Sequence, residues 1–511
     1  MAFVWWRVSD NAADPDLWGH VLYGERMLHL RGLEATDTLS WTAAGLPWIN
    51  HEVLAEVALG LAHRLAGGTG LWLLMVGLAA LSIGWAWQTG AGRDRTQRIV
   101  ALGLLGLVGY HLALGYAARP QLFTLLGFVA LVTVLRKFLA GSLAWGLVLP
   151  LLLVVWVNTH GGFLAGWVFT VLALGAEMFH ASAPGLQRRL HSEPSPWPRL
   201  VLLNVAIAST LALIVNPRGW QLVFWTIGSL QLPRPTLVEW QPMPFAVPSL
   251  PFFCTVALGL AGWIWSRQPR RLWEMLMWGL LAVMSLQHQR HVPLFGLASL
   301  LFLPVHLLAL LHRFSALKVR LLALLAHPAV RGALILVFLL TGGWCLRASV
   351  SAPRLYPFRM EIPRDLYPVA AIDYLRTHRL TGNTVTFFDW GQQVLWELPD
   401  NPVSYDGRLD TVYSREIIDA HARLYAGREP GAALDLDNAR VALLPSGSAG
   451  IALLESRLWA VAYVDPLATV LIRRPYGTYN PLEPQRGGDD AVVGSIPFPD
   501  ESPVLASHFI R

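Results

Sequence analysis

Acidic and imidazole side chains gather between residues 14 and 56, ahead of a long series of apolar stretches. Asp14 and Asp16 flank a proline, which limits backbone freedom and can hold both carboxylates near one site. Such a pair could bind a divalent cation together with His20, or supply a base that takes a proton from an attacking hydroxyl group. The alternative is a turn in which Asp16 caps a helix that starts at Leu17.

The chain is too apolar for a soluble enzyme, because 54% of its 511 residues are hydrophobic and only 14% are charged. Apolar runs of spanning length recur at about residues 71–88, 99–117, 120–135, 143–157, 161–181, 200–215, 250–266, 272–287, 292–311 and 332–348. These runs predict an α-helical polytopic membrane protein with about ten spans and a transmembrane domain over residues 71–348.

The basic residues predict the orientation of these spans, because they gather in alternate loops that should face the cytoplasm. Those loops hold Arg93, Arg95, Arg98, Arg136, Lys137, Arg188, Arg189, Arg199, Arg267, Arg270, Arg271, Arg313, Lys318, Arg320 and Arg331. Residues 14–70 and those after about 349 then lie outside the inner (plasma) membrane. The net charge of +6 reflects this topology and gives no reason to expect nucleic acid as a partner.

An outer loop at the start of the chain needs a preceding segment to carry it across the membrane. MAFVWWRVSDNAA is too short to span the bilayer or to act as a signal peptide. We therefore expect a first span ahead of this sequence, with MAFVWW as its outer end.

The outer loop, residues 1–70, is predicted to hold two amphipathic helices at the membrane interface, from Leu17 to about Leu30 and from His51 to Leu65. Turn residues between them predict a loop. The ionisable side chains of the whole outer loop favour a functional site over a simple turn. They are His20, Glu25, Asp37, His51, Glu52 and Glu56.

Short polar motifs lie at the predicted outer ends of the spans, and the cytoplasmic loops hold nothing comparable. The motifs are Arg119-Pro120-Gln121, Asn158-Thr159-His160-Gly161-Gly162, Asn216-Pro217-Arg218-Gly219, Glu239-Trp240-Gln241-Pro242 and His288-Gln289-Arg290-His291. Ionisable groups near a membrane are costly and usually line a cavity or bind a ligand. Arginines and histidines that converge opposite an acidic loop would bind a phosphorylated ligand.

Each motif also has a structural explanation. Arg119 and Arg290 could snorkel at helix ends, and His160 beside two glycines could permit close helix packing. A turn could explain the Asn, Pro and Gly of the motif at 216–219. Glu239 could be a solvated loop acid. The last motif, an arginine between two histidines, is the hardest to explain by packing.

Residues 349–511 are less apolar and predict an outer, mixed α/β C-terminal domain. The pattern predicts helices at 366–379 and 414–425, strands at 384–388, 441–445, 459–465 and 468–474, an extended segment at 402–406, and a loosely ordered tail from Tyr476. Arg408, between Asp406 and Asp410, could bind substrate from above the membrane. An internal salt-bridged turn is the alternative.

The D-x-D loop, the series of spans and the outer C-terminal domain together resemble the GT-C superfamily of integral membrane glycosyltransferases. The motifs DPDLWGHVLYGE, NHEVLAE, ARPQLFT, NTHGG, NPRGW, EWQP, QRHVPLF, DWGQQVLW and YDGRLDTVY resemble a bacterial branch of it. The resemblance implies transfer of a sugar, with inversion, from a polyprenyl-phosphate or polyprenyl-diphosphate carrier. The acceptor would be a protein, a lipid or a polysaccharide on the outer side.

Asp14 and Asp16 match the acidic motif of the superfamily and are the expected catalytic residues. No cofactor is required by this scheme, although a divalent cation at Asp14, Asp16 and His20 stays possible. The residues expected to bind substrate or phosphate are His20, His51, Glu52, Arg119, Asn158, His160, Arg218, Glu239, His288, Arg290, His291 and Arg408.

Two other classes of protein fit parts of the pattern. A transporter or flippase of lipid-linked sugars would need charged residues near the middle of the bilayer and repeated halves, and the sequence shows neither. An assembly protein that only anchors an outer domain would not need polar motifs confined to one side of the membrane.

Overall fold

The computed structural model describes residues 10–113, 115–232, 237–313, 323–324, 326–350, 358–474, 485–488 and 495–497. The chain forms two compact units. Unit 1 comprises Met1–Asp10 and Met75–Ser349, and unit 2 comprises Asn11–Leu74 and Val350–Arg511. The outer loop, 1–70, and the C-terminal domain, 349–511, are predicted as separate domains, but residues 11–70 and 350–511 fold together in unit 2. MAFVWW lies outside the described residues.

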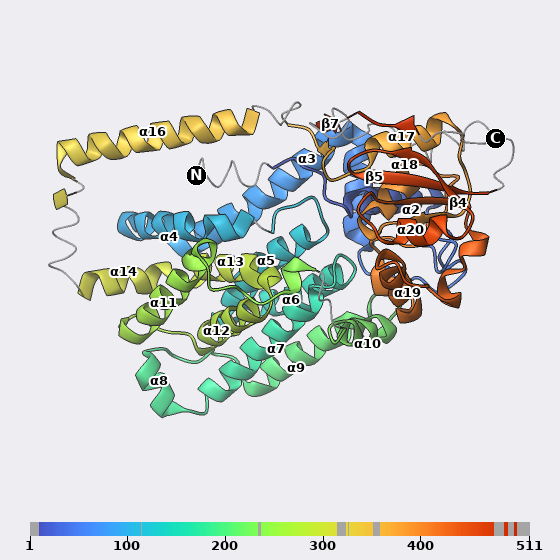
Figure 1. Ribbon diagram of the computed structural model, residues 1–511. Helices are drawn as coiled ribbons and strands as arrows, with labels where there is room; N and C mark the ends of the chain where they lie inside the picture. Colours follow the sequence, from blue (N-terminus) through green and yellow to red (C-terminus); the bar gives the residue numbers. More distant parts are fainter. Residues whose placement is uncertain are drawn as a thin grey trace. The chain divides into compact units, whose positions relative to one another are not determined.

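Unit 1 consists of helices that follow the apolar runs of the sequence (Figure 1). Helices suit a membrane because they satisfy all backbone hydrogen bonds within the segment. The α-helices are the end of α3 (Val53–Ala91), α4 (Arg95–Ala113), α5 (Gln121–Leu139), α6 (Leu143–Val157), α7 (Phe163–His180), α8 (Pro184–Leu190), α9 (Arg199–Leu211), α10 (Trp220–Ser229), α11 (Leu250–Trp265), α12 (Leu272–Gln287), α13 (Val292–Phe302), α14 (Pro304–Arg313) and α16 (Pro328–Val350). Short 3-10 helices are η1 (Ala212–Ile214), η2 (Val238–Trp240), η3 (Val247–Ser249) and η4 (Gln289–His291).

Every predicted apolar run falls on one or two of these helices. By length and composition, four helices in the described part of the chain could each cross a membrane, or five if one bent pair is a single span. That pair covers the run predicted at 292–311, and its two parts are bent by 57° at Pro304. Proline lacks the N–H that would continue the helix, and its ring clashes with the preceding turn.

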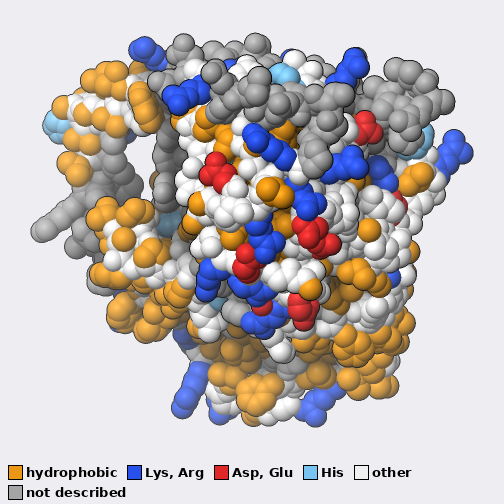
Figure 2. All heavy atoms as spheres, turned by 45° about the vertical axis from the view of Figure 1, so that its right-hand side comes forward, with side chains coloured by type: hydrophobic (Ala, Val, Ile, Leu, Met, Phe, Trp, Pro, Cys, Tyr) orange, Lys and Arg blue, Asp and Glu red, His pale blue; other side chains and the backbone are white. Residues whose placement is uncertain are grey.

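The surfaces of several helices in unit 1 suit a lipid environment. Large aliphatic and aromatic side chains are exposed along α6, α9 and α10, among them Leu147, Leu200 and Phe224. Figure 2 shows hydrophobic side chains gathered into continuous patches of the surface. Exposed apolar patches of this extent mark a surface that contacts lipid or another protein. Together with the long apolar helices, they make the chain a membrane protein.

In unit 2, both helices predicted in the outer loop are present. α2 spans Leu17–Leu30, and the first part of α3 starts at Val53 and ends at a break at Ala66 and Gly67. The apolar side chains of α2, predicted to contact the membrane surface, pack inside the protein instead, since nine consecutive residues from Leu17 to Glu25 are buried. An apolar stripe fits a protein core as well as a bilayer surface, and the sequence pattern does not distinguish them.

α2 and α3 cross with their backbones in contact, and glycines allow the close approach. A Cβ atom on Gly24 would lie 1.9 Å from the carbonyl oxygen of Glu56, and one on Gly60 would lie 2.8 Å from the backbone nitrogen of Glu25. Residues four apart share a helix face, so His20 lies on the same face of α2 as Gly24. The crossing at Gly24 therefore brings His20 Nδ1 to 3.3 Å from Glu56 Oε1. It also brings His63 against Glu25 at 2.6 Å.

We predict that Gly24→Ala lowers the stability of the protein by about 1–3 kcal/mol, because the added methyl group must force the two helices apart. Thermal unfolding of the detergent-solubilised protein would measure this as a lower Tm. Gly77→Ala, in α3, is the matched control, because its Cβ would meet no atom of the described residues within 4 Å. An unchanged Tm for Gly24→Ala would contradict the close crossing.

A five-stranded sheet, ordered β2-β3-β5-β4-β6, forms the centre of the C-terminal part of unit 2. β2 pairs parallel with β3 and β4 with β6, whereas the β3–β5 and β5–β4 pairs are antiparallel. The strands are β2 (Thr384–Thr386), β3 (Val441–Pro445), β4 (Trp459–Val464), β5 (Ala468–Arg473) and β6 (Gln485–Arg486). The predicted strands at 441–445, 459–465 and 468–474 are confirmed, and the one at 384–388 is shorter than predicted.

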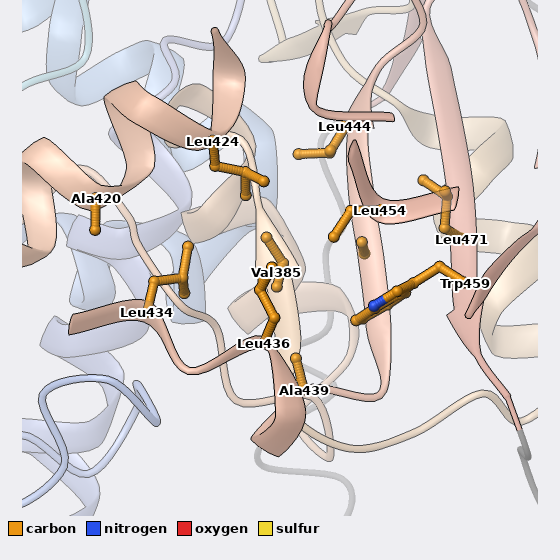
Figure 3. Packing of buried hydrophobic residues seen from close by; sticks show 11 residues of the cluster. Val385, Ala420, Leu424, Leu434, Leu436, Ala439, Leu444, Leu454, Trp459 and Leu471 are labelled. Carbon is orange, nitrogen blue, oxygen red and sulfur yellow. The ribbon is translucent and has the colours of Figure 1, made fainter. Parts of the chain in front are cut away.

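Helices cover this sheet and bury a core of aliphatic side chains around Trp459 (Figure 3). Leu424 of α19 and Leu454 of α20 pack there against Val385 and Leu444 of the sheet. The helices are α17 (Val369–Thr377), α18 (Gly391–Glu397), α19 (Arg415–Tyr425) and α20 (Gly450–Glu455), and short 3-10 helices are η5 (Phe388–Trp390), η6 (Leu409–Thr411), η7 (Ala432–Leu434) and η8 (Leu436–Asn438). A second, antiparallel pair joins β1 (Glu361–Pro363) to β7 (Ser495–Pro497). Most of the tail predicted to be loosely ordered lies outside the described residues.

Backbone and side-chain hydrogen bonds join the loop between α2 and α3 to the C-terminal part of unit 2. Trp41 N–H donates to the Val403 carbonyl at 3.0 Å, and Ile49 N–H donates to the Thr411 carbonyl at 3.0 Å. The Thr42 hydroxyl donates to the carbonyl of Ser404 at 2.6 Å. The segment 402–406, predicted to be extended, thus serves as the partner that holds the outer loop in place.

Candidate active-site clusters

Asp14 and Asp16 differ in what their carboxylates do. Asp14 Oδ1 accepts a hydrogen bond from the Asp16 N–H at 3.0 Å, the local pattern of an Asx turn. α2 starts at Leu17 as predicted, but within the described part of the chain the Asp16 side chain forms no capping hydrogen bond. The turn alternative therefore describes Asp14, and the start of the helix does not use the Asp16 carboxylate.

Two residues of the C-terminal part hold the Asp16 segment. With its side-chain amide turned so that the nitrogen faces them, Gln392, on α18, donates to the carbonyl oxygens of Asp16 at 2.8 Å and Pro15 at 3.2 Å. A Cβ atom on Gly407 would lie 2.4 Å from Asp16 Oδ1, so glycine lets this carboxylate lie directly against the backbone. Neither Gln392 nor Gly407 is among the predicted site residues, although they lie in the motifs DWGQQVLW and YDGRLDTVY.

His20 lies beside two carboxylates that come from the start of α3. His20 Nδ1 is 3.3 Å from Glu56 Oε1 and 3.7 Å from Glu52 Oε2. Asn50 donates to the other oxygen of Glu56 at 2.6 Å, and His51 Nε2 lies 3.6 Å from Glu52 Oε1. One ligand atom from each of His20, Glu52 and Glu56 lies within 4.8 Å of the other two, a spacing that could hold a metal ion.

The negative charges around His20 raise the pKa of its imidazole. Burial by itself would lower the pKa of His20, but the hydrogen bond to Glu56 and the charges of Glu52, Glu56 and Asp16 raise it to about 9. With no cation bound, the imidazole is therefore protonated at neutral pH. Because the charge of Asp16 also raises the pKa of His20, the Asp16 carboxylate shares the electrostatic environment of this cluster. The predicted residues Asp16, His20, His51 and Glu52 thus come together, joined by Glu56.

Arg408 is buried in an ion-pair network, with its side chain only 3% exposed. Its guanidinium donates to Asp37 Oδ1 at 2.6 Å and to Asp406 Oδ2 at 2.7 Å. The Tyr413 hydroxyl donates to the same Asp406 oxygen at 2.7 Å. The internal salt-bridged turn, the alternative given for Arg408, is what the structure has, with Asp37 of the outer loop as an added partner. Arg408 thus holds the outer loop. Because its buried guanidinium is paired with Asp37 and Asp406, Arg408 does not bind an external phosphate in this arrangement.

In unit 1, Glu239 lies between two arginines from different motifs. Its Oε2 is 3.8 Å from Arg119 Nη1, and its Oε1 is 3.7 Å from Arg290 Nη1. The carboxylate is 39% exposed, and both distances exceed those of a charge-assisted hydrogen bond. The two arginines therefore hold this carboxylate loosely, at a place where an anion with more charge could bind.

Aromatic and imidazole rings surround Arg290. Its guanidinium lies over the Trp240 ring at 4.3 Å, and His288 Nδ1 is 2.6 Å from the Trp240 carbonyl oxygen. That carbonyl is an acceptor, so Nδ1 of His288 carries a proton. The rings of His288 and His291 are 6.2 Å apart. η2 and η4 thus bring together Glu239, His288, Arg290 and His291 of the predicted site, with Arg119.

Asn158, His160 and Arg218 lie in segments with clear structural contacts. The Asn158 amide donates to the carbonyls of Val154 and Val215 at 2.8 and 2.7 Å. His160 Nδ1 accepts a hydrogen bond from Gly162 N–H at 3.0 Å and lies 2.8 Å from the Thr124 hydroxyl. Arg218 N–H donates to the side chain of Asn216, at 2.8 Å, in the predicted turn. These contacts fix the turn between α6 and α7 and the turn that precedes α10.

Solved structures of other proteins share the fold of this chain. No family model matches the sequence, and no curated protein matches it significantly. The chain is similar to the crystal structure of the Archaeoglobus fulgidus oligosaccharyltransferase in the apo form, with a TM-score of 0.54 and 12% identity. It is also similar to the archaeal oligosaccharyltransferase AglB from Archaeoglobus fulgidus in complex with an inhibitory peptide and a dolichol-phosphate, with a TM-score of 0.51 and 13% identity.

Both matches cover 85% of this chain and 66% of the archaeal chain, so the protein spans about two thirds of the length of those structures. A third similar structure is ArnT from Cupriavidus metallidurans in the apo state, with a TM-score of 0.49 and 16% identity, covering 92% of this chain and 95% of that one. At these identities the likeness to the archaeal structures shows a shared fold.

Proposed function

We propose that this chain, which has the fold of the GT-C superfamily of integral membrane glycosyltransferases, is an inverting glycosyltransferase. It would move a sugar from a polyprenyl-phosphate or polyprenyl-diphosphate carrier to an acceptor on the outer face of a bacterial inner membrane. The observation that carries the proposal is the position of Asp16: Gln392 contacts the backbone carbonyls of Asp16 and Pro15, and the Asp16 carboxylate lies directly against the backbone at Gly407. The dolichol-phosphate in the archaeal complex supports a lipid-phosphate carrier.

In this mechanism Asp16 is the base. Its carboxylate takes the proton of the acceptor hydroxyl, and the acceptor oxygen attacks the anomeric carbon from the side opposite the lipid phosphate. The bond from that carbon to the phosphate oxygen breaks as the new glycosidic bond forms, and its electron pair leaves with the phosphate. One displacement inverts the configuration. Asp14 positions Asp16, because its carboxylate accepts the Asp16 N–H.

The leaving lipid phosphate gains negative charge as the glycosidic bond breaks. Arg119 and Arg290 would stabilise that charge, with His288 and His291 as nearby donors. In the structure the Glu239 carboxylate lies between the two arginines, with its oxygens 3.8 Å from Arg119 Nη1 and 3.7 Å from Arg290 Nη1. A phosphate with more charge and more acceptor oxygens would compete well for the same guanidinium groups.

We predict that Arg290→Ala lowers kcat for transfer by about 100- to 1,000-fold, the usual effect of removing one group that stabilises developing charge. Arg290→Lys should recover part of the loss, because it keeps the charge but not the planar donor set. Single-turnover release of lipid phosphate from a labelled donor would measure both effects.

Arg267→Ala is the control for this series, since Arg267 is an exposed arginine in a predicted cytoplasmic loop. Its activity should match that of the wild type. An Arg290→Ala variant within twofold of the wild type would remove this cluster from the chemistry.

A further inference from the structure

The crossing of α2 and α3 concentrates negative charge in a buried place. Glu52 and Glu56 are four residues apart, and the Glu56 N–H donates to the Glu52 carbonyl at 2.9 Å, so both side chains lie on one face of a helical turn. The contact at Gly24 then brings His20 of α2 against both carboxylates. Glu56 is 2% exposed and His20 is 9% exposed, so water screens little of this charge.

We propose that His20, Glu52 and Glu56 form a binding site for one divalent transition-metal ion, such as Zn²⁺ or Mn²⁺. The ligand atoms are His20 Nδ1, Glu52 Oε2 and Glu56 Oε1. One imidazole nitrogen with two carboxylate oxygens is a donor set that suits these ions better than Mg²⁺ or Ca²⁺, which prefer oxygen ligands alone.

The distances between ligand atoms agree with such a site. Metal–ligand bonds of about 2.0–2.2 Å in a tetrahedral arrangement place neighbouring ligand atoms about 3.3–3.6 Å apart. His20 Nδ1 lies 3.3 Å from the Glu56 oxygen and 3.7 Å from the Glu52 oxygen. The Glu52 and Glu56 oxygens lie within 4.8 Å of one another, so a shift of up to about 1.5 Å between the two carboxylates would bring all three atoms to a common metal ion, with one position left for water or substrate.

Neighbouring side chains hold both carboxylates in orientation. Asn50 donates to Glu56 Oε2 at 2.6 Å, which leaves Glu56 Oε1 directed to His20. His51 Nε2 lies 3.6 Å from Glu52 Oε1, the oxygen that is not the proposed ligand. Partners of this kind fix the ligands of metal sites and usually change metal affinity about 10- to 100-fold when removed. The site differs from Asp14, Asp16 and His20, the set named in the sequence analysis, and shares only His20 with it.

Metal binding by the purified, full-length protein tests the proposal. After removal of metals with a chelator, isothermal titration with Zn²⁺ and Mn²⁺ should give one bound ion per chain, and the ion should raise Tm. Glu52→Gln is the mildest ligand change, because Glu52 is the most exposed of the three residues. It should weaken binding at least 100-fold, and Asn50→Ala should weaken it about 10-fold.

Two controls separate this site from its neighbours. Glu25→Gln alters the other His–Glu pair at the same crossing, and Asp16→Asn alters the adjacent carboxylate. Both variants should still bind one ion per chain, and Asp16→Asn should weaken binding far less than Glu52→Gln, because it removes a nearby charge but no ligand. The Tm of each metal-free variant reports whether it is folded, so that loss of binding is read only from folded protein.

Wild-type protein that binds neither ion in the micromolar range would overturn the proposal, as would full binding by folded Glu52→Gln. The proposed metal site lies near Asp16, but metal binding and sugar transfer can be tested independently. Metal binding without transfer would leave the site standing and remove the proposed function. Transfer that persists in chelator, in protein that binds no metal, would do the reverse.

Discussion

Asp16→Asn is expected to abolish sugar transfer while leaving the protein folded. Asparagine keeps the size of the side chain beside Gly407 but cannot accept a proton at neutral pH. A general base contributes about 100- to 10,000-fold to the rate, so transfer should fall by this factor. Single-turnover release of lipid phosphate from a labelled polyprenyl-phosphate sugar, with a cell-envelope fraction as the source of acceptor, would measure the loss.

Asp14→Asn is the matched control, because the asparagine side-chain oxygen can still accept the Asp16 N–H and keep the Asx turn. Its rate should stay within about tenfold of the wild type, since it removes charge but keeps the position of Asp16. Equal losses in the two variants would contradict the assignment of Asp16 as the base. Full activity in Asp16→Asn would exclude the whole loop from the chemistry.

Arg408→Met is expected to lower the free energy of unfolding by about 3–5 kcal/mol, because it leaves the carboxylates of Asp37 and Asp406 buried without their cation. Methionine fills a similar volume, so the loss would come from charge rather than from a cavity. Denaturant unfolding in detergent, followed by tryptophan fluorescence, would measure it. Trp48, whose ring lies 5.1 Å from the guanidinium carbon, is one of the 23 tryptophans that contribute to this signal.

Arg415→Met is the control for this effect. Arg415 pairs with Asp419 at 3.8 Å on the surface of α19, with both side chains more than half exposed. A surface pair of this kind contributes about 0–1 kcal/mol. If Arg408→Met cost no more than Arg415→Met, the buried network would not hold the outer loop to the C-terminal part of unit 2.

The secondary structure was largely predictable because its signals are local. Apolar runs mark the helices of unit 1, and the short strands VALLP and ATVLI consist mostly of apolar residues because the sheet is covered. The start of α2 at Leu17 and the end of the first part of α3 near Leu65 follow from turn residues around them. The bend at Pro304 was not predicted, because hydropathy alone joined α13 and α14 into one run.

The site was less predictable because its contacts join residues far apart in the chain. Nothing near Asp16 indicates that Gln392 and Gly407 will hold it, since these residues are more than 370 positions away. The partner of Arg408 among the acids of the outer loop, Asp37, is equally distant. Spacing gives the types of residue that a site needs, whereas long-range packing decides which of them meet.

Some predicted residues changed role for the same reason. Hydropathy placed α2 at a membrane surface, but α18 packs on it and buries it. The motif around Arg408 combines charges of both signs, which a substrate site and an internal salt bridge share. Only the positions of Asp37 and Asp406, on either side of the guanidinium, distinguish the two.

The central claim is that this protein breaks the bond between a sugar and a lipid phosphate. The most direct measurement is to incubate the purified wild-type protein with a polyprenyl-phosphate sugar, labelled in the sugar, and an envelope fraction, and then to quantify the lipid phosphate and the labelled acceptor. We predict that lipid phosphate is released in proportion to labelled acceptor, and that the new glycosidic bond has the inverted configuration. Donor that stays intact, or that crosses the bilayer of a vesicle without cleavage, would contradict the account.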